Sequence, residues 1–235
     1  MADLDGFVLV HGGHHDRTCW QLMMPLLTRP AIAVDLPGRG SRPWTGAAIT
    51  IEDCAQAVLA DADAAGLRRF VLVGHSMGGL TISRVALDAP ERVAHLVYVG
   101  ALAPAPGQNA AQALGVEVAT DQPDSAMLPP LPDEICRAMF GNDMTEEQWA
   151  IAGQGIVAEA VNLFRDTLPR YATGIPTTYV GMTHDMPVPP PLAAQMIENL
   201  GPGVDVVSLD AGHNVMLSQP ALLAGVLEGI AAESA

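Results

Sequence analysis

The sequence predicts an α/β fold, in which a mostly parallel sheet of about six strands is flanked by helices and carries a helical cap insertion. Strand-like and helix-like segments alternate along most of the 235 residues. The strand-like runs are almost continuously apolar, which is typical of strands whose two sheet faces are both covered. One segment rich in proline, alanine and methionine interrupts the alternation. The length suits one domain with a large core.

Each strand is predicted from a short apolar run. The six runs are residues 6–10, 31–35, 70–74, 93–100, 176–181 and 204–209. Helical patterns separate them, and the clearest one begins after Thr50. Thr50 can cap this helix, Asp53 stands at the capping-box position, and apolar side chains recur on one face. Strands alternating with helices predict parallel pairing through right-handed crossovers.

The alternation breaks over residues 104–170. We therefore treat residues 1–235 as one domain whose core is 1–103 and 171–235 and whose cap insertion is 104–170. Helical patterning is visible there only in residues 145–164, and no strand is predicted. A disordered linker is the alternative, against which the apolar content argues. We expect the cap to lie over the carboxyl edge of the sheet.

Composition excludes several classes of partner. Asp and Glu number 26 against 11 basic residues, giving a net charge of −15, and every basic residue is arginine. Such a surface argues against nucleic acid and anionic membranes as partners, and without lysine there is no Schiff-base chemistry. We expect no signal peptide and no membrane helix. Three scattered cysteines indicate reduced thiols. A cytoplasmic protein with a small-molecule substrate is expected, and a homodimer is compatible with the sequence.

The stretch "GHSMGG", residues 74–79, follows a predicted strand and precedes a predicted helix. G-x-S-x-G in this context is typical of a nucleophile elbow. The serine occupies a strained turn, so Gly74 and Gly78 must be small. The following helix directs free N–H groups toward an oxyanion. The alternative is a purely structural turn. The pattern predicts Ser76 as a nucleophile.

A serine nucleophile needs a base and an orienting acid. His213 follows the last predicted strand and is the predicted base, a plain loop histidine being the alternative. Asp185 follows the penultimate strand and is the predicted acid. Its rival, Asp210, lies only three residues before His213, where a role in the turn is favoured. His184 is expected to be a solvated loop residue and His95 to be packed within a strand.

The first predicted loop contains His11, Gly12 and Gly13. This loop supplies the second oxyanion donor in folds with a nucleophile elbow, so the N–H groups of Gly13 and Met77 are predicted to form the oxyanion hole. A metal site from His11, His14 and His15 is the competing idea. Adjacent histidines project in divergent directions, and we expect no metal.

Together these motifs make the chain resemble the α/β-hydrolase superfamily, and within it the plant-type methylesterases and hydroxynitrile lyases with their bacterial relatives. The resemblance is carried by "VHGGHHDRTCWQLMMPLL", "VDLPGRG", "GHSMGG", "YVGMTHD", "QMIEN" and "DAGHNVMLSQP". It implies Ser76, Asp185 and His213 as a triad, with Gly13 and Met77 as oxyanion donors and no cofactor. It further implies that His15 and Trp20 support the pocket.

Two departures favour an esterase. Hydroxynitrile lyases of this type carry a lysine after the catalytic histidine and a threonine in the first loop, where this chain has Asn214 and Gly12. The leading hypothesis is a serine hydrolase that cleaves a small, neutral, largely apolar ester through an acyl-enzyme. The second is a biosynthetic lyase, elimination or cyclisation enzyme with His213 as base. The third is a small-molecule binding protein.

We expect the substrate to contact Gly12, His15 and apolar side chains of the cap. The cap offers Met127, Leu128, Leu131, Ile135, Met139, Phe140 and Trp149. Of these, Met127, Leu128 and Trp149 are the predicted substrate-binding residues. Arg137 is the nearest candidate for a positive partner.

Overall fold

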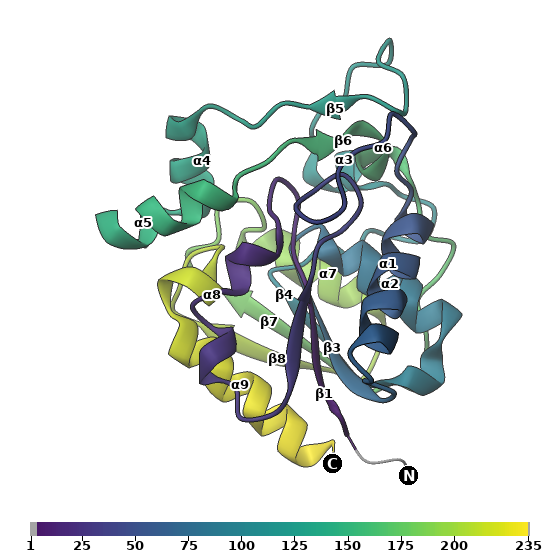
Figure 1. Cartoon of the computed structure of the whole chain (residues 1–235), viewed down its shortest axis with the longest axis vertical. Coiled ribbons are helices and arrows are strands. Elements are labelled where there is room, and N and C mark those ends of the chain that lie inside the picture. The colour runs from purple at the N-terminus through teal and green to yellow at the C-terminus, as the bar shows by residue number, and fades with distance from the viewer. Residues whose placement is uncertain (1–3, 235) are drawn as a thin grey trace.

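The computed structural model describes residues 4–234, and its centre is a six-stranded sheet (Figure 1). In spatial order the strands are β2 (Ala31–Val34), β1 (Gly6–Val10), β3 (Phe70–His75), β4 (Val93–Val99), β7 (Thr177–Met182) and β8 (Val204–Leu209). Every neighbouring pair is parallel. The predicted fold class is confirmed, and each strand boundary lies within a residue of its prediction.

Two hydrophobic cores cover the two faces of the sheet, because alternate residues of each strand point to opposite sides. The first core includes Val8 and Leu72 and packs against α1 (Ile51–Ala64), α2 (Gly78–Asp88) and α7 (Pro190–Leu200). The second includes Leu9 and Val73. It packs against the 3-10 turns Arg17–Trp20 and Met24–Leu26 and against α8 (Val215–Ser218) and α9 (Pro220–Glu233). A further 3-10 turn, Pro90–Arg92, leads into β4.

Local capping sets the start of α1 as predicted. The Thr50 hydroxyl accepts a hydrogen bond from the Asp53 N–H, and the Asp53 carboxylate accepts one from the Thr50 N–H. This reciprocal pair satisfies two amides that would otherwise lack partners at the helix terminus.

Residues 104–170 form several short elements grouped on one side of the molecule (Figure 1). They are α3 (Ala110–Leu114), β5 (Met127–Leu128), α4 (Asp133–Phe140), α5 (Glu146–Ala152), the 3-10 turn Gly153–Gly155, β6 (Glu159–Ala160) and α6 (Val161–Arg165). The expectation that this segment has no strand is wrong, because β5 and β6 pair antiparallel. Each strand has only two residues, which is too short to leave an alternating pattern.

The helical pattern in residues 145–164 is also not one helix. It is divided into α5 and α6, with the Gly153–Gly155 turn and β6 between them. Glycine is unfavourable inside a helix, and two glycines two residues apart end this one. No helix within residues 4–234 is long and apolar enough to cross a membrane.

Candidate active site

Ser76 occupies the sharp turn between β3 and α2. Its φ of 51° lies in the left-handed region, which a non-glycine residue adopts only when its surroundings hold it there. Three backbone hydrogen bonds do so. The Ser76 N–H donates to the Val99 carbonyl at 3.1 Å, and the Ser76 carbonyl accepts from Gly79 at 3.0 Å and Leu102 at 2.8 Å.

Small residues are required after this turn and in the first loop that faces it. A Cβ on Gly78 would lie 2.6 Å from the His11 carbonyl oxygen, and a Cβ on Gly12 would lie 2.7 Å from the Ser76 Cβ. Both separations are below any real contact. The glycines therefore let the first loop, the serine turn and the N-terminus of α2 approach one another closely.

His213 and Asp185 meet in the interior, from the loops after β8 and β7. His213 Nδ1 lies 2.9 Å from Oδ1 and 2.8 Å from Oδ2 of Asp185, and both side chains are fully buried. Asp185 Oδ1 also accepts the Val188 N–H at 2.7 Å. Because a carboxylate only accepts, the proton is on Nδ1 and Nε2 is left as an acceptor. This buried Nε2 has no hydrogen-bond partner among the described residues.

Gly100 and His75, neither of which was a predicted site residue, lie beside this pair. Gly100 follows β4 with φ 49°, and a Cβ there would lie 2.7 Å from Asp185 Oδ2. His75 donates from Nε2 to the His213 carbonyl at 3.1 Å, and the two rings lie 4.5 Å apart. Burial holds the pKa of His75 well below its usual value, so its ring is neutral. The positive φ at Gly100 was not visible in the sequence.

Asp210 does not contact His213. Its exposed carboxylate accepts from Thr183 Oγ1 at 3.0 Å and pairs with His184 Nε2 at 2.8 Å. The expected role in bonding the turn backbone is thus replaced by side-chain contacts to the neighbouring loop. His184 is exposed, as expected, and His95 is buried within β4 beside Thr178.

The first loop, residues 11–15, brings Gly13 to the same region. Among the described residues, neither the Gly13 N–H nor the Met77 N–H has a hydrogen-bond acceptor. Met77 directly precedes α2, so its N–H belongs to the positive end of that helix. Both N–H groups are consequently available to an oxygen atom of a ligand.

The three histidines of this loop point to different partners. His11 Nε2 accepts from the Leu36 N–H, His14 Nδ1 donates to the Val157 carbonyl, and His15 Nδ1 donates to the Gly13 carbonyl. No group of three or more His, Cys, Asp or Glu side chains within residues 4–234 is arranged to hold a metal ion. The loop does not fit a metal site.

Asn214 links the first loop to the loop that carries His213. Its Nδ2 donates to His15 Nε2 at 2.9 Å, while His15 Nδ1 donates to the Gly13 carbonyl at 2.7 Å. Accepting at Nε2 while donating from Nδ1 requires a neutral imidazole. Burial lowers the pKa of His15 to about 4, so the ring is neutral over most of the working pH range.

We expect His15 to make stability pH-dependent. An unfolded histidine titrates near pH 6.5, so between that value and about 4 the unfolded chain binds more protons here than the folded chain. The contribution of neutral His15 to the free energy of unfolding is present above pH 6.5 and is lost as the pH falls. Between pH 7 and pH 5 the free energy of unfolding should fall by about 2 kcal/mol on this account. Urea unfolding of the wild type and His15→Asn at both pH values measures it. Equal pH dependence in the two proteins would contradict the expectation.

Of the apolar cap residues, Phe140 lies against the site. Its ring centroid is 5.0 Å from that of His15 and 5.8 Å from that of His213. Trp149 is buried against Gly141 and lies under Arg137. Met127 and Leu128 are half-buried in the first core, and Met127 lies beside Gly38. These three predicted substrate-binding residues have no described contact with Ser76 or His213.

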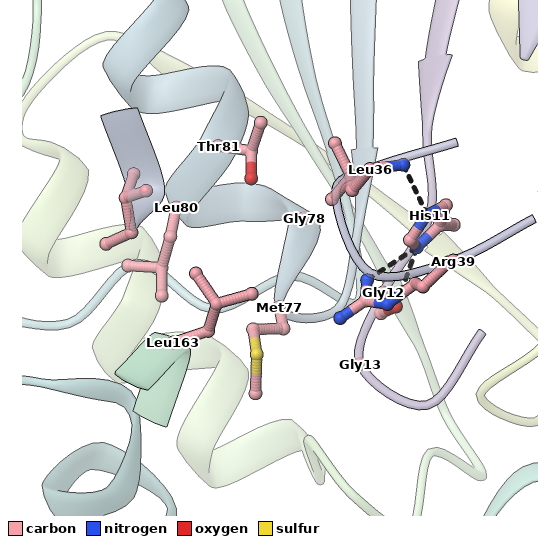
Figure 2. A pocket seen from close by; sticks show the side chains of 11 residues that line it. His11, Gly12, Gly13, Leu36, Arg39, Met77, Gly78, Leu80, Thr81 and Leu163 are labelled. Atoms are coloured by element: carbon pink, nitrogen blue, oxygen red, sulfur yellow. Dashed lines mark hydrogen bonds between the residues drawn. The ribbon is translucent and has the colours of Figure 1, made fainter. Parts of the chain in front are cut away.

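The arginine nearest the site is Arg39, not the Arg137 that the sequence suggested. Arg137 is partly exposed and pairs with Glu146 at 2.5 Å. Arg39 is buried instead and pairs with Glu159 of the cap. Arg39, Gly13 and Met77 line a cavity of about 10 Å³ behind the first loop (Figure 2). That volume is about the size of a single water molecule.

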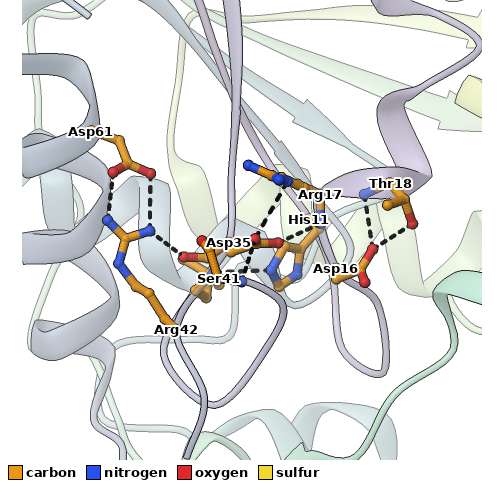
Figure 3. A network of polar contacts seen from close by, with 9 residues as sticks. His11, Asp16, Arg17, Thr18, Asp35, Ser41, Arg42 and Asp61 are labelled. Carbon is orange, nitrogen blue, oxygen red and sulfur yellow. Dashed lines mark hydrogen bonds and ion pairs between the residues drawn. The ribbon is translucent and has the colours of Figure 1, made fainter. Parts of the chain in front are cut away.

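Asp35, at the end of β2, ties the loops around this cavity together (Figure 3). Its carboxylate accepts the N–H groups of Arg17 at 3.1 Å and Ser41 at 2.8 Å. Arg42 donates to the Asp35 carbonyl and forms a bidentate pair with Asp61 of α1. The Asp35 carboxylate therefore joins the loops after β1 and β2. The Arg42–Asp61 pair attaches only the second of these loops to α1.

A parallel sheet with a strained serine turn, a buried His–Asp pair and free loop amides defines the α/β-hydrolase class. The chain belongs to the alpha/beta hydrolase family, whose sequence model matches residues 7–226. It is similar to the pyrethroid hydrolase of Sphingobium wenxiniae, with 28% identity over 95% of this chain and 86% of that protein. It is also similar to the probable esterase PIR7A of rice, Oryza sativa, with 35% identity over 44% of this chain and 41% of that protein.

Solved structures agree with the fold. An extracellular alpha/beta-hydrolase from a Paenibacillus species superposes with a TM-score of 0.82 at 23% identity, over 96% of this chain and 98% of that one. The methylesterase MES16 of Arabidopsis gives a TM-score of 0.81 at 20% identity, over 98% of this chain and all of that one. The predicted resemblance to the α/β-hydrolase superfamily is confirmed, and the fold is shared with a plant methylesterase.

Proposed function

We propose that the protein is a serine ester hydrolase that forms an acyl-enzyme at Ser76. Ester cleavage as the class of activity is supported by the similarity to proteins named as esterases and hydrolases, among them the pyrethroid hydrolase and the rice esterase. The observation that carries the proposal is the buried His213–Asp185 pair, whose Nε2 atom is free to accept a proton.

In the proposed reaction His213 Nε2 removes the proton of Ser76 Oγ as Oγ attacks the ester carbonyl carbon. The C–O bond to the alcohol then breaks, and His213 returns the proton to the leaving alkoxide. Water attacks the acyl-enzyme in the same way and regenerates the serine. Asp185 holds the imidazole in the required tautomer and stabilises its transient positive charge.

The N–H groups of Gly13 and Met77 are proposed to bind the oxyanion of each tetrahedral intermediate. Both lack a protein acceptor, and α2 adds the partial positive charge of its N-terminus. Such donors act most strongly when they are already in place before charge develops, and the loop contacts at Gly12 and Gly78 support that arrangement.

A neutral and largely apolar ester is the proposed substrate. The site is bordered by Phe140, His15 and Met77, and the pKa of His15 keeps that ring uncharged. Arg39 and Arg137 are each already paired with a glutamate. A buried carboxylate on the substrate would therefore lack a counterion, which costs several kcal/mol.

We expect a neutral short-chain ester to be hydrolysed with kcat/KM at least about tenfold higher than its analogue with a free carboxylate on the acyl chain, the equivalent of about 1.4 kcal/mol. Steady-state assays at low and high salt measure the ratio. High salt should lower the ratio of the two kcat/KM values only in part. Salt screens the repulsion between the anionic ester and the net charge of −15, but it does not remove the cost of burying an unpaired carboxylate in the site. A preference for the charged analogue would contradict the substrate proposal.

A further inference from the structure

The cap contains a buried carboxylate that reaches the first loop. Glu159, in β6, has a fully buried side chain. Its Oε2 accepts the His14 N–H at 2.9 Å, and its Oε1 accepts the Ala160 N–H at 2.8 Å and pairs with Arg39. An ionised carboxylate is costly to bury unless it is paired and hydrogen-bonded, and this one is both.

Two further contacts join the same part of the cap to the first loop. The Val157 N–H donates to the His14 carbonyl at 2.9 Å, and His14 Nδ1 donates to the Val157 carbonyl at 3.0 Å. His14 has a φ of 57° and, with Ser76, is one of two non-glycine residues with positive φ in the described chain. The cap therefore holds the residue next to Gly13 in an unfavourable conformation.

The carboxylate lies close to the proposed oxyanion donor itself. A Cβ built on Gly13 would be 3.1 Å from Glu159 Oε2. An uncompensated negative charge here would oppose a developing oxyanion, because charges interact strongly at short range in a buried site. Arg39, from the loop after β2, supplies the compensating charge and lines the same cavity as Gly13 (Figure 2).

From these contacts we propose that Glu159 is a positioning residue of the cap that fixes the Gly13 N–H for catalysis, and that Arg39 neutralises it. The inference rests on the proposed acyl-enzyme function. With Glu159 in this role, the oxyanion hole is complete only while the β6 segment lies against the first loop. The cap then contributes to the chemistry as well as to the binding of the substrate.

The test is E159Q. An amide has one acceptor oxygen, so it cannot serve the His14 N–H, the Ala160 N–H and Arg39 together. We expect kcat for a short p-nitrophenyl ester to fall by roughly 10- to 100-fold while KM stays within about twofold, because a misplaced oxyanion donor weakens the transition state selectively. The inhibition constant of a trifluoromethyl ketone should rise by a similar factor. Ser76 Oγ adds to the ketone carbon, its proton passes to His213, and the ketone oxygen becomes an oxyanion.

D61N is the matched control. The Arg42–Asp61 pair also anchors the loop after β2, but neither side chain bonds to residues 11–15. We expect D61N to retain kcat and the inhibition constant. All rates are normalised to the number of sites that a fluorophosphonate labels, which removes any unfolded fraction from the comparison.

If E159Q does not fold, R39M/E159Q replaces it, because that variant leaves no unpaired buried charge. The same loss of kcat and of inhibitor affinity is expected. Unchanged values in the folded variant, or a loss no greater than in D61N, would overturn the inference. Absence of labelling at Ser76 in the wild type would instead overturn the acyl-enzyme proposal, so the two failures are distinguishable.

Discussion

Ser76→Ala is expected to abolish covalent labelling by a fluorophosphonate and to lower kcat for ester hydrolysis by about 10⁴-fold or more. The left-handed turn and its three backbone hydrogen bonds place the serine at the N-terminus of α2, beside the first loop. Without Oγ the proposed acyl-enzyme cannot form, and residues that act as a triad lose their effect together. Mass spectrometry of the labelled protein and steady-state kinetics measure the two effects.

Ser83→Ala is the control for this variant. Ser83 also lies on α2, but its hydroxyl is buried and bonds to the Gly79 carbonyl and Tyr98. We expect labelling and turnover to persist in Ser83→Ala. Near-normal turnover in Ser76→Ala would contradict the acyl-enzyme proposal and would favour a reaction in which His213 acts directly on the substrate as a base.

Asp185→Asn is expected to lower kcat by about 10³- to 10⁴-fold. The asparagine Nδ2 would face His213 Nδ1, which now donates to both carboxylate oxygens. The imidazole would have to move its proton to Nε2, the atom that is proposed to accept the proton of Ser76. The Val188 N–H keeps a partner in the side-chain oxygen, so the loop should hold its position.

Asp210→Asn provides the comparison. Its exposed carboxylate contacts only Thr183 and His184 side chains, and an exposed pair of this kind contributes little to stability. We expect kcat to stay within about twofold of the wild type, in the range of ordinary surface substitutions. The reverse ranking of the two variants would show that the acid is wrongly assigned even though the fold is correct.

The sequence alone determined the fold class. Strands that are covered on both faces are short, continuously apolar runs, and such runs can be located in the sequence to within about a residue. It also pointed to the geometry around Ser76, since a serine between glycines at a strand–helix junction has few explanations. Chain order favoured Asp185 over Asp210, and in the structure Asp185, not Asp210, contacts His213.

Only the tertiary structure decided how the cap meets the core. Two-residue strands carry no pattern, so β5 and β6 were missed, and Phe140 could not be distinguished from Met127, Leu128 and Trp149 as the cap side chain against His213. Arg39 and Glu159 lie 120 positions apart, and nothing local to either predicts their pairing. Buried charges are paired by the packing of distant segments, and that packing depends on contacts that a single sequence does not display.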